Sequence, residues 1–398
     1  RSSRGLGDVY KRQIKELSFA LKETSHNLIF SSHLFPSSED LDELMTILNL
    51  PLPDQKELKN LIKTIAINTN SNLNEQDLNE LSIASSGLTE IKVKQVTAKA
   101  LAQRGKIGKE DINDILEEKK QVIARSEILE FFQAKSNQDD IGGLSVLKVW
   151  LNQRFRAFSK EARDYGLPVP KGVLLVGAQG TGKSLTAKSI SKSWAMPLLR
   201  LDVGRLFSSL VGSSEARTRE TISRAEAMSP CILWIDEIDK GFGGDARSDG
   251  GTSQRVLASL LTWMAEKESA VFVIATANAI DKLPAELLRK GRFDEIFFLD
   301  LPNSEERLSI LDLHLKKRRP SYNFPLSTII DRTEGFSGAE LEQAVIEGMH
   351  ISFSENRELM EKDLVKAVSE LVPLSRTAKE QIDLLKEWSS TGRARSAS

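Results

Sequence analysis

Scarcity of several residue types excludes whole classes of protein. The chain has one cysteine, Cys231, so it cannot form an intramolecular disulfide, which fits a reducing compartment. The four histidines show no metal-ligand spacing with the cysteine or with one another: His26, His33, His314 and His350. No apolar run approaches the roughly 18 residues that cross a bilayer, which predicts no membrane span. A net charge of −1 provides no overall surface for a polyanion.

The rest of the composition is that of a globular protein. With 398 residues the chain can form about two or three domains, and its 40% hydrophobic and 28% charged content is ordinary. Arg1–Gln13 is rich in Gly, Arg and Ser, lacks an initiating Met and resembles translated adapter sequence. We therefore expect a non-native leader there and a missing true N-terminus. Residues 375–398 end in small and basic residues and are predicted to be a frayed tail.

A phosphate-binding loop is the strongest motif. Gly177–Ser184 fits G-x-x-x-x-G-K-[ST] without a mismatch, between an apolar run at Gly172–Val176 and a helix-permissive segment at Leu185–Trp194. Strand, glycine loop and helix together place backbone N–H groups and a helix N-terminus around phosphate oxygens. Lys183 is predicted to neutralise the β- and γ-phosphates, and the Ser184 hydroxyl to ligate Mg²⁺. The alternative is a glycine-rich turn before a helix.

Apolar runs that alternate with helical patterns predict the fold around this loop. The strand candidates are Val173–Val176, Leu198–Leu201, Cys231–Ile235, Val271–Ile274 and Ile296–Leu299. Helical patterns between them predict an α/β core with a parallel, doubly wound sheet over residues 140–303. Residues 304–374 have no convincing strand and predict a helical lid. A polar, turn-forming segment at residues 131–139 is the predicted linker before the core.

Two carboxylates end one of these strands. Asp236 follows Cys231–Ile235 and is placed to anchor Mg²⁺ at the C-terminal edge of the sheet. Glu237 would polarise the attacking water. Asn278, after the next strand candidate, could orient that water or contact the γ-phosphate. The alternatives are solvated acids at a strand end and a turn asparagine.

Two arginines lie in the segment Leu287–Asp294. A planar guanidinium, such as that of Arg289 or Arg292, suits the charge spread over transferring phosphoryl oxygens, and it is often supplied by a neighbouring subunit. From the residues alone, two surface arginines at a helix end remain an open alternative.

The first part of the chain echoes the last part. Strand-like runs at Leu28–Ser32 and Ile47–Asp54 are followed by helices, a small-residue break and further helices, as are Val271–Thr276 and Ile296–Asn303. This order predicts that residues 14–130 are the rear half of a second ATPase-like module, with strands and a helical lid. The first copy lacks the arginines of the second and is predicted to be degenerate. The alternative is a chance likeness between two strand–helix units.

Together these motifs resemble the AAA family of ATPases over about residues 139–374. The residues that carry the resemblance are Asp140-Ile141-Gly142-Gly143, Gly177–Ser184, Asp236-Glu237, Asn278, Arg289, Gly291-Arg292-Phe293-Asp294 and Gly335-Phe336-Ser337-Gly338-Ala339-Glu340. More narrowly, residues 231–240 and 288–294 resemble the uncharacterised AAA-domain proteins of algal plastid genomes and cyanobacteria, the ycf class. A soluble protein of the chloroplast stroma or cyanobacterial cytoplasm is implied by that resemblance.

The resemblance also implies roles for particular residues. It implies an ATP-binding set of Ile141, Gly142, Gly177, Ala178, Gln179, Gly180, Thr181, Gly182, Lys183, Ser184, Leu185, Gly338 and Ala339. Ile141 and Gly142 would line the adenine pocket, approached from the lid by Gly338 and Ala339. The implied Mg²⁺ ligands are Ser184 and Asp236, and the implied catalytic residues are Glu237, Asn278, Arg289 and Arg292. Both arginines would act in a neighbouring subunit's site, which implies a ring, expected to be a hexamer.

We therefore expect Mg²⁺-dependent ATP hydrolysis coupled to the conformational remodelling of an unknown protein partner. Leu210 stands where protein-threading members carry an aromatic grip, which weakens an unfoldase interpretation. The alternative, from a different class, is a nucleotide-regulated binding scaffold or switch with slow turnover. Lys316–Arg319 is basic but has no interleaved aromatics, so we expect a solvated helix end and no nucleic-acid partner.

Overall fold

A computed structural model describes residues 3–22, 24–26, 29, 46, 48, 52–124, 128–132, 141–207, 213–242 and 252–398. The chain divides into two units, residues 1–52 and 53–398. The first contains helix α1 (Ser3–Leu21), which runs across the boundary expected after Gln13. Most of the strand-like residues predicted between 28 and 51, and residues 133–139 of the predicted linker, lie outside the described residues.

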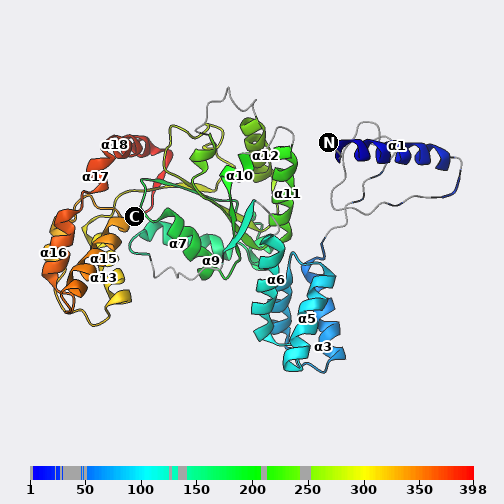
Figure 1. The fold of residues 1–398 in the computed structure, drawn as a ribbon, viewed down its shortest axis with the longest axis horizontal. Coiled ribbons are helices and arrows are strands. Elements are labelled where there is room, and N and C mark those ends of the chain that lie inside the picture. The colour runs from blue at the N-terminus through cyan, green and yellow to red at the C-terminus, as the bar shows by residue number, and fades with distance from the viewer. Residues whose placement is uncertain are drawn as a thin grey trace. The chain divides into compact units, whose positions relative to one another are not determined.

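A seven-stranded sheet forms the centre of the second unit, in the order β1-β3-β4-β5-β2-β6-β7. Figure 1 shows its strands as arrows among the helices. The strands are β1 (Leu129–Phe132), β2 (Gly172–Gly177), β3 (Leu198–Leu201), β4 (Cys231–Ile235), β5 (Val271–Ala277), β6 (Glu295–Leu299) and β7 (Arg395–Ser396). The five strands expected from the sequence are confirmed as β2 to β6, and each neighbouring pair among them runs parallel. Strand β2, which precedes the predicted phosphate-binding loop, therefore lies inside the sheet, between β5 and β6.

The two edge strands differ from expectation. β1 runs antiparallel to β3, with Leu129 opposite Leu201, so the linker expected to begin at residue 131 begins inside a strand. β7 pairs with β6, and the Ala397 N–H donates to the Phe298 carbonyl at 3.0 Å. The expectation of a frayed tail is therefore wrong for the described residues. Both edges depend on hydrogen bonds to distant strands, which local composition does not reveal.

Helices cover both faces of the sheet because apolar side chains alternate along its strands. Cys231 and Leu233 face one layer, and Ile232 and Trp234 face the other. Helices α11 (Ser213–Ala227), α12 (Thr252–Glu266) and α18 (Lys379–Trp388) pack on the first face, and α7 (Ser145–Arg156) and α9 (Lys183–Ser193) on the second. The remaining helical segments of this part are α8 (Lys160–Asp164), α10 (Val203–Phe207), η3 (Ile238–Phe242), α17 (Leu374–Thr377) and η4 (Ser389–Arg393). The doubly wound arrangement is thus confirmed.

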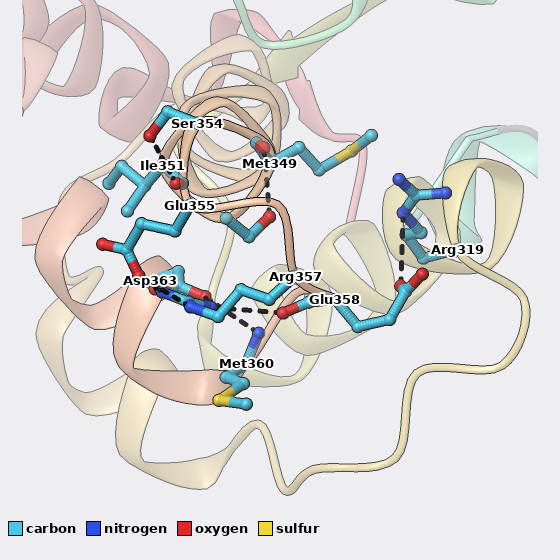
Figure 2. A network of polar contacts seen from close by, with 10 residues as sticks. Arg319, Met349, Ile351, Ser354, Glu355, Arg357, Glu358, Met360 and Asp363 are labelled. Carbon is cyan, nitrogen blue, oxygen red and sulfur yellow. Dashed lines mark hydrogen bonds and ion pairs between the residues drawn. The ribbon is translucent and has the colours of Figure 1, made fainter.

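The predicted lid is also helical, with a core of its own. It consists of α13 (Ser304–Arg318), α14 (Ser327–Arg332), α15 (Gly338–Ser354) and α16 (Glu361–Glu370). Figure 2 shows the turn from α15 to α16, where the Arg357 guanidinium donates to both carboxylate oxygens of Asp363 at 2.6 Å. The Met360 N–H donates to the same carboxylate at 3.0 Å. This buried carboxylate fixes the start of the last lid helix.

A separate helical layer precedes the sheet. It contains α3 (Gln55–Asn68), α4 (Glu75–Ser85), α5 (Glu90–Arg104), η1 (Lys109–Asp111) and α6 (Ile112–Ala124), packed around their own apolar core. The layer meets the α/β core closely: a Cβ on Gly87 (φ +84°) would lie 2.6 Å from Met228 Sδ and 2.7 Å from the Ala227 carbonyl oxygen. α6 contacts β1 as well. In the described part of the chain, none of the helices combines the length and apolar content that a membrane span requires.

Candidate nucleotide-binding and hydrolysis site

The glycine loop connects β2 to α9 and folds over its own lysine. Gly180 (φ +80°) and Gly182 (φ +90°) adopt left-handed backbone conformations that glycine favours, so the chain can curl at the N-terminus of α9. The Lys183 Nζ donates to the carbonyls of Gly177 at 2.8 Å and Ala178 at 2.6 Å. Burial lowers the pKa of Lys183 to about 8. The loop therefore positions a cation and a turn of backbone N–H groups at one place, which is an anion-binding arrangement.

The acidic strand end lies directly against this loop. The Ser184 hydroxyl donates to Asp236 Oδ1 at 3.0 Å, joining the start of α9 to the end of β4. Thr276 on β5 donates to the same oxygen at 2.8 Å and accepts from the Glu237 N–H at 2.8 Å. The Thr276 side chain is almost fully buried. One hydroxyl thus sets the position of both acidic residues.

Serine and carboxylate oxygens at this point fit Mg²⁺, which prefers oxygen ligands and keeps several waters or phosphate oxygens. Among the described residues no group of three or more His, Cys, Asp or Glu side chains could hold a metal ion. An ion at Ser184 and Asp236 would therefore need water or phosphate oxygens as its other ligands.

Both carboxylate oxygens of Glu237 have partners. The Asn278 amide Nδ2 donates to Oε1 at 3.0 Å, and Lys240 Nζ lies 2.5 Å from Oε2. Glu237 has a φ of +50°, which costs on the order of 1–3 kcal/mol for a non-glycine residue and is typical of functional sites. The two residues expected to handle the attacking water are therefore in direct contact.

A buried aspartate fixes the loop that carries these groups. The Asp239 carboxylate accepts the backbone N–H groups of Asn278 and Ala279, each at 3.2 Å. From α18, the Gln381 side chain donates to the Asn278 carbonyl at 3.0 Å. These hydrogen bonds hold η3, which begins directly after Glu237, against the segment that follows β5.

The residues expected around the adenine lie where the lid meets the core. A Cβ on Gly142 would lie 2.6 Å from Ile310 Cγ1 of α13, and one on Gly338 would lie 3.8 Å from Ile310 Cδ1. The Ala339 N–H donates to the Gly180 carbonyl at 3.2 Å, so α15 begins against the glycine loop. Ile141 is buried beside this junction, and its carbonyl accepts from Lys148. The structure thus places Gly142 and Gly338, from the beginning and the end of the predicted ATP-binding set, next to the same side chain, Ile310.

The two arginines do not join this cluster within one subunit. Arg289 is exposed, and Arg292 is half-buried with its Nε lacking a partner among the described residues. Within those residues, no hydrogen bond or ion pair connects either arginine to the glycine loop or to Asp236. Asp294 of the same segment accepts the N–H groups of Lys171 and Gly172, at 2.8 and 3.0 Å, and so attaches the segment to the start of β2.

Sequence reasoning missed Thr276, Asp239, Lys240 and Ile310. Asp239 and Lys240 follow Asp236 by three and four residues, so a cluster of charged residues at the strand end was visible in the sequence. Thr276 could have been found from the expectation that neighbouring parallel strands end side by side. Ile310 offered no signal, because only the packing of the lid brings it to the loop.

Leu210, the expected substrate-contacting position, lies outside the described residues.

Strand order, glycine loop, acidic strand end and helical lid define a P-loop domain of the AAA ATPase class.

Comparison with known proteins agrees with that class. Residues 173–301 match the ATPase family associated with various cellular activities (AAA), and residues 56–126 match a family described as SpoVK-like AAA ATPase, second domain. An uncharacterized AAA domain-containing protein ycf46 from Pyropia yezoensis is 47% identical over 393 residues, 98% of this chain and 80% of that protein. Its counterpart in Guillardia theta is 46% identical over 397 residues, 99% of this chain and 78% of that protein. The chain belongs to this ycf46 family of AAA domain-containing proteins.

A more distant relative has a different name. An ATP-dependent zinc metalloprotease FtsH from Cyanidium caldarium is 35% identical over 243 residues, 59% of this chain and 39% of that protein. The similarity to FtsH thus covers only part of each chain.

Proposed function

We propose that this protein hydrolyses ATP in a Mg²⁺-dependent reaction and uses the energy to remodel a protein partner. The observation that carries the proposal is the continuous set of contacts from Ser184 through Asp236 and Thr276 to Glu237 and Asn278. Membership of an AAA ATPase family supports it. A site that only bound nucleotide would not need a carboxylate and an amide held together beyond the metal-binding groups.

Binding is assigned to the glycine loop and its neighbours. Lys183 would exchange its two carbonyl partners for phosphate oxygens, and the loop N–H groups would hold the remaining phosphate charge. Ser184 and Asp236 would hold Mg²⁺, which when bound neutralises phosphate charge and orients the β- and γ-phosphates. The adenine would lie at the junction of Gly142, Gly338 and the lid.

Turnover is assigned to Glu237 and its partners. The Glu237 carboxylate would accept a proton from the attacking water, and Asn278 would orient both. Thr276 connects the two acidic residues through a single hydroxyl, which donates to the Asp236 carboxylate and accepts from the Glu237 backbone N–H. Proton transfer of this kind typically contributes a rate factor of about 10²–10⁴.

Assembly into a ring, expected to be a hexamer, is part of the proposal. Arg289 is exposed, and its guanidinium makes no hydrogen bond or ion pair with the described residues of its own subunit, as expected of an arginine that completes a neighbouring site. Members of the family commonly form such rings. A location in the chloroplast stroma or the cyanobacterial cytoplasm is proposed from the algal sources of the relatives.

A nucleic-acid partner is not proposed, because three of the four basic side chains in the run at the end of α13 lie beside acidic partners. Lys316 pairs with Asp312 at 2.8 Å, and Arg318 pairs with Glu342 at 2.6 Å. Arg319 lies 3.8 Å from Glu358 (Figure 2).

Residues 14–130 are proposed to be the rear half of a degenerate second module, in which α3–α6 correspond to the lid helices α13–α16. α3 begins with a capping box from Asp54 after Leu52-Pro53, and α13 with one from Asn303 after Leu301-Pro302. The match of residues 56–126 to an AAA ATPase domain supports this correspondence.

Corresponding turns share further features. Gly87 (φ +84°) precedes α5, and Gly335 (φ +77°) precedes α15. At the start of the last helix of each set, a buried aspartate pairs with an arginine six or seven residues before it: Asp111 with Arg104, and Asp363 with Arg357. A capping box at the first helix and an Arg–Asp ion pair at the last helix of both sets support a common origin.

The proposal is tested by ATPase rate per subunit against protein concentration, with saturating Mg²⁺-ATP and a parallel ATP-binding assay. We expect a rate that rises with concentration, an Arg289→Ala variant that lacks this rise, and a Glu237→Gln variant that binds ATP without turnover. Arg332→Ala, an exposed arginine on the lid, is the matched control. A flat profile would exclude the shared site. ATP binding without turnover in the unmodified protein would favour the nucleotide-regulated scaffold instead.

A further inference from the structure

The carboxylate assigned as the base is held on both sides. Asn278 donates to Oε1 of Glu237 at 3.0 Å, and the Lys240 ammonium lies 2.5 Å from Oε2. A base must present an oxygen to the water from which it takes a proton, at about 2.6–3.2 Å. Each carboxylate oxygen can accept a second hydrogen bond, as Asp236 Oδ1 does, so the two partners decide the direction in which the Glu237 carboxylate faces. The carboxylate can turn toward a water placed elsewhere only when one of them yields.

The position of Lys240 is built into the fold. Its N–H donates to the Glu237 carbonyl at 2.9 Å, which closes the first turn of η3. Asp239, which directly precedes Lys240, anchors that turn to the backbone of Asn278. The pairing of Lys240 with Glu237 therefore follows from the turn itself, and not from a chance surface contact.

The two partners of Glu237 are held to different degrees. Asn278 is fixed through its own backbone, because its N–H is bonded to Asp239 and its carbonyl to Gln381. Lys240 has a flexible side chain that is 68% exposed. Exposed ion pairs of this kind are weak and exchange readily with water, so Lys240 is the partner that yields.

We propose that Lys240 is a positioning residue that acts as a latch: its ion pair with Glu237 turns the carboxylate away from water until the pair opens. This inference rests on the proposed hydrolytic function. Each subunit then spends part of its time with the base held by Lys240, and turnover proceeds from the open fraction. Among the residues that the structure describes, the contacts of Lys240 do not include the glycine loop, so we expect ATP binding to be independent of the latch.

The test compares Lys240→Met, which removes the ammonium at similar length, with Lys240→Arg, which keeps a cation. We expect Lys240→Met to raise kcat about two- to fivefold, the range set by an exposed ion pair, with an unchanged KM for ATP. Lys240→Arg should retain the unmodified kcat. The matched control is Lys94→Met on α5, which removes an exposed lysine paired with Glu90 at 3.1 Å, and it should change neither constant.

A measurement without nucleotide tests the ion pair itself. Thermal unfolding of the nucleotide-free protein is followed for Lys240→Met, Glu237→Gln and the double variant. The changes in thermal midpoint of the two single variants should add up to more than the change in the double variant, because each single substitution removes the same ion pair.

The outcomes separate the latch from the function on which it rests. An unmodified protein that binds ATP but never turns over would overturn the proposed hydrolysis. An active protein whose Lys240→Met variant has an unchanged or lower kcat, or an altered KM, would overturn the latch alone. Additive unfolding effects, or a raised kcat in Lys240→Arg, would also overturn it.

Discussion

Replacing Lys119 with methionine is expected to stabilise the protein at neutral pH. Lys119 belongs to α6, where that helix packs beneath the sheet, and its side chain is 1% exposed. Burial lowers the pKa of Lys119 to about 8, because the charged ammonium is removed from water. Cys231 is the group whose charge would offset this cost. Burial raises the pKa of the Cys231 thiol to about 12, so at pH 7 the thiol is neutral and provides no compensation.

The size of the effect follows from the shift in pKa. A change from the ordinary lysine value of 10.5 to about 8 corresponds to about 3 kcal/mol, at roughly 1.4 kcal/mol per unit. Between these two values the unfolded chain binds more protons than the folded one, so the free energy of unfolding rises with pH there. Below pH 8 the ammonium is charged in both states, and the full cost is present. Methionine removes that cost and fills similar space, so the gain at pH 7 is expected to approach this value.

The single cysteine offers a direct assay. Cys231 is completely buried, so a thiol reagent labels it only when the surrounding structure opens. At pH 7 and in mild denaturant, about 3 kcal/mol predicts labelling roughly 100-fold slower in Lys119→Met than in the unmodified protein. Lys120→Met on the same helix is the control, because the Lys120 side chain is 52% exposed and paired with Glu117 at 3.6 Å.

Two results would refute this reasoning. The first is faster labelling of Lys119→Met, which would mean that the ammonium makes a net favourable contribution. The second is an equal rise in stability between pH 8 and 10.5 with and without Lys119, which would assign the pH dependence to another group.

Three further predictions concern the site, an interface and acid stability. Thr276→Val should lower kcat by about 10- to 100-fold in a steady-state ATPase assay, because it removes a hydrogen bond to the Asp236 carboxylate worth about 1.5–3 kcal/mol. Gly87→Ala should lower the thermal midpoint by about 3–8 °C, since its Cβ would meet Met228 and its φ is +84°. Hydrogen bonds from Arg357 lower the pKa of Asp363, so its contribution to stability is present above pH 3.8 and lost as pH falls further. The Asp363→Asn variant should therefore lose less stability on acidification than the unmodified protein, measured as the thermal unfolding midpoint at a series of pH values.

Each of these predictions has a matched control. Thr97→Val removes another buried threonine hydroxyl and should leave kcat unchanged; an equal fall in both variants would contradict a specific role for Thr276. Gly105→Ala imposes similar backbone strain (φ +72°) with nothing within 4 Å, so an equal loss there would exclude the contact with Met228. Asp331→Asn changes an exposed aspartate and should follow the unmodified acid profile.

Much of the site could be predicted because its residues follow one another along the chain. Gly177–Ser184 places every loop N–H, Lys183 and Ser184 within eight consecutive residues, so their spacing alone predicts a phosphate site. The same holds for β4, whose apolar run ends at Asp236 and Glu237. Lys240 was within reach of the same reasoning, since it lies one turn beyond Glu237.

The sequence by itself determined the glycine loop, the five central strands, the acidic strand end and the helical lid, because each depends on local spacing or periodicity. Only the tertiary structure decided that Thr276 fixes Asp236 and Glu237, since that contact joins residues 40 positions apart. It also decided that β1 closes one edge of the sheet, and that Lys119 is buried rather than solvated. These features depend on which surfaces meet after folding, and hydrogen bonds and desolvation between distant segments leave no periodic trace in the sequence.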